Sequence, residues 1–144
     1  GEFDVFGSNG VVGSHSSFII EHPFIVVGRK GSAGAVHYST RNGFPIDTTF
    51  YISANELKAP NISLPFLFYN LKSLGLDKTS SQQTVPGLNR NDAYRMKIPL
   101  PKLEIQEEVI SKIMEEESLV SSNKKLFELY TQKIQNRISK IWGE

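Results

Sequence analysis

A short segment bounded by glycines, residues 28–34, is the first place where the residue types favour anion binding. It reads Gly-Arg-Lys-Gly-Ser-Ala-Gly. Nucleotide-binding loops space their glycines differently and lead into a helix whose N-terminus holds the phosphate. Here the strand-like run 35–38 follows instead. We therefore predict a β-hairpin turn with Arg29 and Lys30 at its tip, where the two cations either contact a nucleic-acid backbone or are merely solvated.

A long polar segment, residues 80–90, carries amide and hydroxyl side chains that can read base edges. Gln and Asn can form paired hydrogen bonds with adenine, and Arg can do so with guanine. The alternative is an ordinary surface loop, and the sequence alone does not decide between the two. Lysines and arginines from other segments would add phosphate contacts if they lie on the same face of the protein as this polar segment. The predicted DNA-binding residues are Arg29, Lys30, Ser32, Arg41, Lys78, Ser80, Ser81, Gln82, Gln83, Asn89 and Arg90, and Lys72 is a further candidate for the phosphate patch.

Pro45-Ile46-Asp47 and Glu56-Leu57-Lys58 are superficially similar to the residues of a Mg²⁺-dependent nuclease. In such an enzyme an Asp and a Glu hold the metal, and a Lys lies beside the attacked phosphate. The pattern is common by chance, and Glu56 falls in a polar stretch instead of a strand. We therefore favour an ordinary loop and keep the nuclease as an alternative.

Other catalytic or metal-binding chemistry finds no support in the sequence. The three histidines are scattered, without Asp or Glu at ligand spacing, so no metal site is predicted. The lack of cysteine excludes disulfides, thiolate zinc sites and cysteine nucleophiles. No serine lies in a nucleophile elbow. The sequence therefore predicts a binding function, with no catalytic residue.

The elements that would position these residues form a body that is mostly β. Asn9-Gly10 is a tight-turn signal between two short strands. Ser63 can cap a helix whose first turn tolerates Pro65 and which ends at Gly75. Strands are predicted at residues 4–6, 11–12, 17–20, 24–27, 35–38, 49–52 and 94–100.

The last part of the chain, residues 102–144, is predicted to be one long helix. It has no Pro, and no Gly before Gly143. Acidic residues crowd its first part and basic residues its last, which favours antiparallel pairing with a similar helix over a surface helix on its own domain. The helix also carries an apolar residue at every seventh position: Ile113, Val120, Phe127, Ile134 and Ile141. A sustained seven-residue repeat is typical of a left-handed coiled coil.

Composition sets limits on these predictions. The chain has 144 residues, of which 39% are hydrophobic and 22% charged, as expected for a folded protein. The net charge is +1, so binding to nucleic acid would need a local basic patch. No apolar run is long enough to cross a bilayer and no signal peptide is visible. The lack of cysteine fits a reducing cytoplasm, where we expect the protein. The chain begins without Met inside a strand, so we expect a piece of a longer protein.

Five segments resemble one repeat of a type I restriction-modification specificity subunit, and their order along the chain is that of the family. The most specific is Ile98-Pro99-Leu100-Pro101-Lys102-Leu103-Glu104-Ile105-Gln106, which resembles the family's signature at the start of its spacer helix. Lys102 departs from the second Pro that the family often has there, which affects only how the helix begins. The other four segments are the basic hairpin 28–34, the strand 49–52, the aromatic helix 65–71 and the segment 85–89.

The resemblance implies an α+β fold: a small β-rich target recognition domain with short helices, residues 1–101 and incomplete at its N-terminus, followed by a conserved spacer helix, residues 102–144, in an antiparallel coiled coil. It also implies a non-catalytic DNA-recognition subunit that reads one half of a bipartite duplex target. The second helix would come from a second repeat or from a homodimer. Methyltransferase subunits and a restriction motor subunit would be its partners and would carry S-adenosylmethionine, ATP and Mg²⁺, with no cofactor in this chain. A coiled-coil adaptor without a DNA role is the other alternative.

Overall fold

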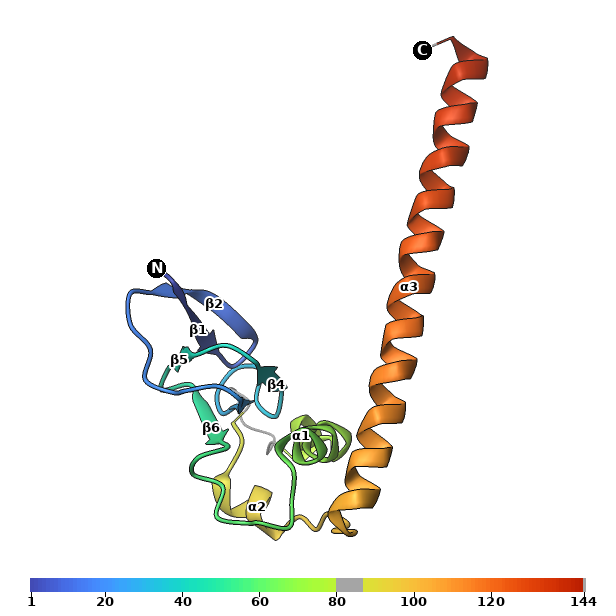
Figure 1. The fold of residues 1–144 in the computed structure, drawn as a ribbon. Coiled ribbons are helices and arrows are strands. Elements are labelled where there is room, and N and C mark those ends of the chain that lie inside the picture. The colour runs from blue at the N-terminus through green and yellow to red at the C-terminus, as the bar shows by residue number, and fades with distance from the viewer. Residues whose placement is uncertain (80–86, 144) are drawn as a thin grey trace. The chain divides into compact units, whose positions relative to one another are not determined.

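The computed structural model describes residues 1–79 and 87–143, with the backbone alone at residues 78 and 79. The chain divides into two compact units, Gly1–Gln106 and Glu107–Glu144. The first unit holds the strands and the short helices, and the second is the greater part of one long helix (Figure 1). We describe each unit by itself.

One sheet is built around the N-terminal hairpin. Strand β1 (Phe3–Gly7) pairs antiparallel with β2 (Gly10–His15) and parallel with β5 (Gly43–Pro45). Gly10 has a φ of 104°, a conformation that glycine adopts without strain. The tight turn predicted at Asn9-Gly10 is therefore confirmed.

The second sheet has β3 (Phe24–Gly28) at its centre. It pairs antiparallel with β4 (Val36–Ser39) on one side and with β6 (Thr49–Ser53) on the other. All five residues of β3 are buried, as expected for a central strand covered on both faces.

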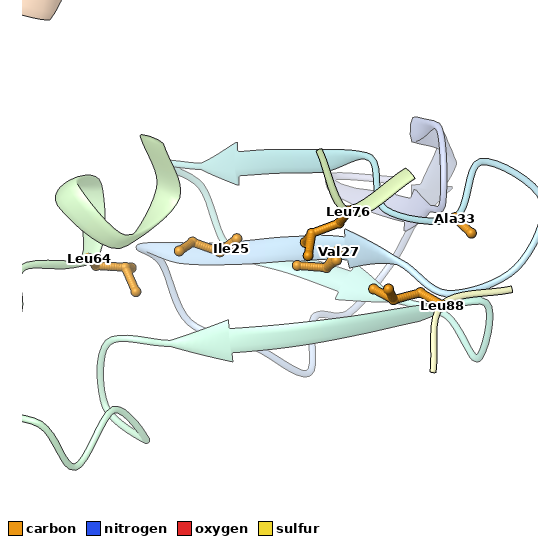
Figure 2. Packing of buried hydrophobic residues seen from close by; sticks show 6 residues of the cluster. All are labelled: Ile25, Val27, Ala33, Leu64, Leu76 and Leu88. Atoms are coloured by element: carbon orange, nitrogen blue, oxygen red, sulfur yellow. The ribbon is translucent and has the colours of Figure 1, made fainter. Parts of the chain in front are cut away.

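Alternation along β3 sends its side chains into two hydrophobic clusters. Ile25 and Val27 point to one side, where Figure 2 shows them among Leu64, Leu76 and Leu88 from other segments, with Ala33 at the hairpin. Phe24 and Val26 belong to the other cluster. Because successive side chains of a strand point to opposite faces, one short apolar run supports both cores. The second cluster consists of Phe6, Ile20, Phe24 and Val26.

The predicted aromatic helix is α1 (Leu64–Ser73), and its signals act as expected. The Ser63 hydroxyl accepts a hydrogen bond from the Phe66 N–H at 3.3 Å, and Pro65 lies in the first turn. Gly75 follows the helix with a φ of 63°. The helix and both of its ends are confirmed, and a short 3-10 helix, η1 (Leu76–Thr79), comes next.

Two of the predicted strands are wrong. Residues 17–20 form only an isolated bridge from Ile20 to Gly43, because the His15 ring accepts the Ser17 N–H at 3.1 Å and bends the chain. The run 94–100 instead begins inside α2 (Arg90–Arg95), which Asn89 caps. The cap favours a helix, and Pro99 cannot donate to a sheet ladder.

The long C-terminal helix is confirmed as α3 (Leu103–Trp142), of 40 residues. At about 1.5 Å per residue this is a rod of about 60 Å. Four of the five residues of the seven-residue repeat are strongly exposed, with exposed fractions from 59% at Ile134 to 80% at Ile141. The apolar stripe of α3 is therefore largely exposed among the described residues.

The first turn of α3 belongs to the first unit and is held there by a buried amide. The Gln106 side chain is fully buried. Its Oε1 accepts the Ser63 N–H at 2.9 Å, and its Nε2 donates to the carbonyls of Asn61 at 2.7 Å and Pro101 at 2.8 Å. The amide thus joins the start of α3 to the loop that caps α1.

Candidate nucleic-acid interface

The basic segment 28–34 forms the predicted turn between β3 and β4. The Gly28 N–H donates to the Ala35 carbonyl at 2.8 Å, and the Gly34 N–H donates to the Gly28 carbonyl at 2.8 Å. A Cβ on Gly28 would collide with the carbonyl of Ser32, so glycine is required for steric reasons. The predicted hairpin is therefore confirmed, and the absence of a following helix excludes a phosphate site of the nucleotide-loop type.

The backbone of this hairpin binds two other segments. The Arg29 N–H donates to the Thr48 carbonyl at 2.8 Å, and the Arg29 carbonyl accepts the Leu88 N–H at 2.9 Å. Lys30 forms an isolated antiparallel bridge with Gly87. The segment just before α2, Gly87 and Leu88, thus pairs with the edge of the basic hairpin. As a result, Arg29 and Lys30 lie beside the end of the polar segment that the sequence singled out separately.

Two arginines from these segments meet at one aromatic ring. The guanidinium carbon of Arg29 lies 5.6 Å from the centroid of the Phe50 ring, and that of Arg90 lies 4.9 Å from it. Both arginines are exposed. Within residues 1–79 and 87–143, no carboxylate lies within ion-pair distance of either guanidinium. The two guanidiniums therefore form a local positive patch at this ring, which we call the Phe50 patch. Lys30 follows Arg29 directly in the hairpin.

Asn89 belongs to the same place but has a structural role. Its Oδ1 accepts the Asn91 N–H at 2.9 Å and so caps α2. Paired hydrogen bonds with adenine need both the amide oxygen and the amide nitrogen. Base reading by Asn89 would therefore compete with the cap, and its assignment as a DNA-binding residue stays a prediction.

Ser32 and Lys72 lie together on another side of the hairpin. They line a cavity of about 370 Å³ with His37 and Asp77. The Lys72 ammonium also lies 5.6 Å from the centroid of the Phe68 ring on α1. A different cavity, of about 500 Å³, is lined by Phe50 and Arg90. Ser32 and Lys72 do not line it, so they form a second small polar group.

Arg41 is not brought to the Phe50 patch. Its guanidinium donates to the Glu2 carbonyl at 3.3 Å and lies 3.6 Å from the Asp4 carboxylate. Arg41 lies two residues after Ser39, which pairs with the first residue of β3. Arg29 directly follows the last residue of β3, so the two arginines come from opposite ends of that strand. The expectation that Arg41 shares a phosphate-binding face with Arg29 is therefore not supported by the register.

The remaining predicted residues fall on the least described part of the chain. Lys78 lies in η1, and its side chain is not described. Four further predicted residues lie outside the described residues, and their DNA contacts stay predictions: Ser80, Ser81, Gln82 and Gln83.

The carboxylates of the nuclease alternative do not form a pair. Asp47 precedes β6 and Glu56 follows it, so the two lie beyond opposite ends of a five-residue strand. At about 3.3 Å per residue the strand alone separates them by about 13 Å, whereas both ligands of one Mg²⁺ must lie about 2.1 Å from it. The Glu56 carboxylate accepts the Ser53 hydroxyl at 3.0 Å. Across the described residues, no group of three or more His, Cys, Asp and Glu side chains is placed to hold a metal ion.

The chain has counterparts among known proteins. The model of the type I restriction modification DNA specificity domain family matches residues 1–138. The chain belongs to this family. The resemblance seen in its motifs is thus confirmed, and specificity domains of this family serve DNA recognition in type I restriction-modification systems.

A solved structure shows the same fold. The crystal structure of a type I restriction-modification system S subunit from M. genitalium is similar to the chain, with a TM-score of 0.72 and 19% sequence identity over 90% of the chain. That match covers 35% of the S subunit, so the chain spans about a third of its length. Among proteins with curated descriptions, none matches the chain.

The α+β fold class is confirmed: small sheets of short strands and short helices, followed by one long helix. Among the described helices, none combines the length and apolar character needed to cross a membrane.

Phe50 is the functional candidate that the sequence did not indicate. Its segment, 49–52, has the β-branched and aromatic composition of any half-buried strand. The ring becomes notable only through the two arginines, which come from segments far away in the sequence. No local pattern marks this meeting point.

Proposed function

We propose that this chain reads one half of a bipartite duplex DNA target as part of a type I restriction-modification specificity subunit, and that it has no catalytic role. The observation that carries the proposal is the Phe50 patch, where Arg29 and Arg90 meet at one ring on the first unit. Lys30 is the next residue of the same hairpin. In this proposal residues 1–101 are the target recognition domain. Residues 102–144 are the spacer helix.

The chemistry of the patch suits DNA. Exposed guanidiniums can pair with phosphate oxygens or with the O6 and N7 atoms of guanine. The patch is also local, as a nearly neutral chain requires. In our proposal the hairpin cations contact phosphates, while Arg90, Asn89 and the polar segment before them contact base edges.

Charge reversal tests this assignment. In a binding titration with a duplex library, Arg29→Glu with Lys30→Glu should weaken binding to all sequences, and the slope of log K against log salt should become shallower by about 1.8 if two phosphate contacts are lost. Lys124→Glu, which changes the charge of one exposed residue of α3, is the control and should alter the affinity much less. Equal affinities for the parent and the double variant would exclude this patch as the DNA interface. If the parent itself does not bind duplex DNA, the protein-protein adaptor becomes the better assignment.

We further propose that α3 pairs antiparallel with a like helix, from a second repeat or a second copy, and so sets the distance between two half-sites. The exposed repeat Val120, Phe127, Ile134 and Ile141 supports a helical partner. The match to only 35% of an S subunit leaves room for a second repeat. Acidic residues in the first part of α3 would lie opposite basic residues of its partner, which stabilises the antiparallel arrangement.

Polar substitutions in the repeat test the pairing. Phe127→Asp with Ile134→Asp should abolish self-association in analytical ultracentrifugation, because each would bury a carboxylate in the helix interface. Glu128→Asp is a control that leaves the stripe intact. A double variant that associates as strongly as the parent would show that this stripe is not the interface.

The remaining partners follow from the same proposal. Methyltransferase subunits would dock on the chain and supply S-adenosylmethionine chemistry, and a motor subunit with ATP and Mg²⁺ would cleave DNA, all in the cytoplasm. Purified chain with Mg²⁺ should therefore leave DNA intact. Co-purification with a methyltransferase subunit encoded beside it would support the docking, and cleavage by the chain alone that Asp47→Ala abolishes would instead establish the nuclease.

A further inference from the structure

We propose that Phe50 is a positioning residue for DNA binding, because its ring holds the guanidiniums of Arg29 and Arg90 in the orientation in which they meet the duplex. This inference rests on the proposed function and assigns a role to a residue that itself need not touch DNA. It predicts that the ring contributes to affinity through the two arginines alone.

The ring is a rigid support because strand and core hold it. Phe50 lies in β6, where it pairs with Val27 of the fully buried central strand. Its side chain is partly buried and packs against the cluster that contains Val27, Leu76 and Leu88. Packing against the core restricts the ring on one side, so it can order flexible side chains that lie against it.

Both arginines are anchored at the backbone before their side chains reach the ring. Arg29 is held on one side by Thr48 and on the other by Leu88. Arg90 is the first residue of α2, directly after the cap residue Asn89. The remaining freedom is in the two long side chains, whose guanidinium carbons lie 5.6 and 4.9 Å from the ring centroid.

The electrostatics favour an anion at this place. The negative face of an aromatic ring attracts a cation, and the Phe50 ring lies near two of them. Across the described residues, both guanidiniums keep free N–H donors, from which a phosphate or a guanine edge can accept hydrogen bonds. Because the ring restricts the side chains before binding, less conformational freedom is lost when DNA arrives. Preorganisation of this kind raises affinity without adding a contact.

The test is a thermodynamic cycle on DNA affinity. Phe50→Leu keeps an apolar side chain but removes the ring face, and we expect it to weaken duplex binding by about 3- to 10-fold, as loss of modest cation–π contacts would. The salt slope should stay unchanged, because no charge is lost. Phe50→Tyr restores a ring and should bind like the parent. In a chain with Arg29→Ala and Arg90→Ala, Phe50→Leu should have no further effect.

A merely structural role predicts a different pattern. Ile52→Val trims a neighbour that packs against the same cluster, so it controls for general loosening of the core. If Phe50→Leu weakens binding equally with and without the two arginines, or if Ile52→Val weakens it as much, the positioning role is refuted. Should Phe50→Leu fail to fold in a thermal melt, Phe50→Tyr and Phe50→Met in both arginine backgrounds give the same comparison.

The two proposals fail in different ways. If Arg29→Ala with Arg90→Ala binds DNA like the parent, the proposed interface is wrong. If that double variant loses affinity while Phe50→Leu binds like the parent, the interface stands and only the positioning role is wrong.

Discussion

Replacing Gln106 by Met should destabilise the first unit by about 2–4 kcal/mol. Met has a similar length and no amide, so it fills the space but removes the hydrogen bonds to Ser63, Asn61 and Pro101. A typical intramolecular hydrogen bond contributes about 0.5–1.5 kcal/mol, and a buried group left without a partner costs about 1–3 kcal/mol. The two carbonyls lie in partly buried surroundings where water can replace some of the lost bonds, so the full sum of these penalties is not expected.

The assay must report on the first unit. Far-UV circular dichroism is dominated by the 40-residue helix α3, and Trp142 lies exposed at its end. Urea unfolding followed by tyrosine fluorescence, together with hydrogen exchange at the Ser63 amide, monitors the affected region. Protection at Ser63 should fall in the variant, because its acceptor is gone. The free energy of unfolding should fall with it.

A second substitution at the same position distinguishes hydrogen bonding from packing. Gln106→Glu keeps an acceptor for the Ser63 N–H but directs a carboxylate oxygen at two carbonyls, so it should be at least as destabilising at neutral pH. Protonation would restore one donor, and the defect should shrink as the pH falls. Gln135→Met on α3 is the matched control and should stay within about 0.5 kcal/mol of the parent, since its side chain is exposed. If Gln106→Met unfolds at the same urea concentration as the parent, the amide contributes nothing and the reasoning fails.

Two further perturbations test the fold around the interface. Gly34→Ala should destabilise the hairpin by more than about 1 kcal/mol, because φ is 86° there and a Cβ would collide with the backbone of Leu76 and Asp77; an unchanged melting temperature would contradict this. Burial raises the pKa of the Tyr38 phenol above its ordinary value of 10.0, so its contribution to stability should be complete below pH 10.0 and should be lost as the pH rises through the raised pKa. Ultraviolet titration of parent and Tyr38→Phe checks this, and a tyrosine that ionises at its ordinary pKa in the folded chain would contradict it.

The elements that the sequence predicted well are those with local causes. The turn at Gly10, the cap at Ser63 and the end of α1 at Gly75 each follow from the conformational preferences of a few adjacent residues. The long helix follows from an uninterrupted run without Pro. The two strand errors, at 17–20 and 94–100, arose where apolar composition was outweighed by a side-chain hydrogen bond or by a cap. The apolar composition of a segment does not indicate such competing hydrogen bonds.

The candidate site was predicted in parts but not as a whole. The sequence indicated the hairpin cations and the polar segment as separate features, and it included Arg41 with them. The structure joins Arg29 with Arg90 and leaves Arg41 beside Asp4, at the other end of β3. Which cations share a face depends on strand register and on where the chain returns to the sheet edge. Neither is encoded in the spacing of the charged residues.

By itself the sequence determined the class of the molecule: a β-rich body, one long helix with an apolar seven-residue repeat, and the motifs of a specificity domain. These depend on interactions within a few residues or one turn of helix, so they can be read along the chain. Only the tertiary structure decided that the Phe50 ring lies beside two arginines and that Gln106 is buried with three hydrogen bonds made. Both outcomes require segments far apart in sequence to meet, and such meetings are set by the packing of the whole core.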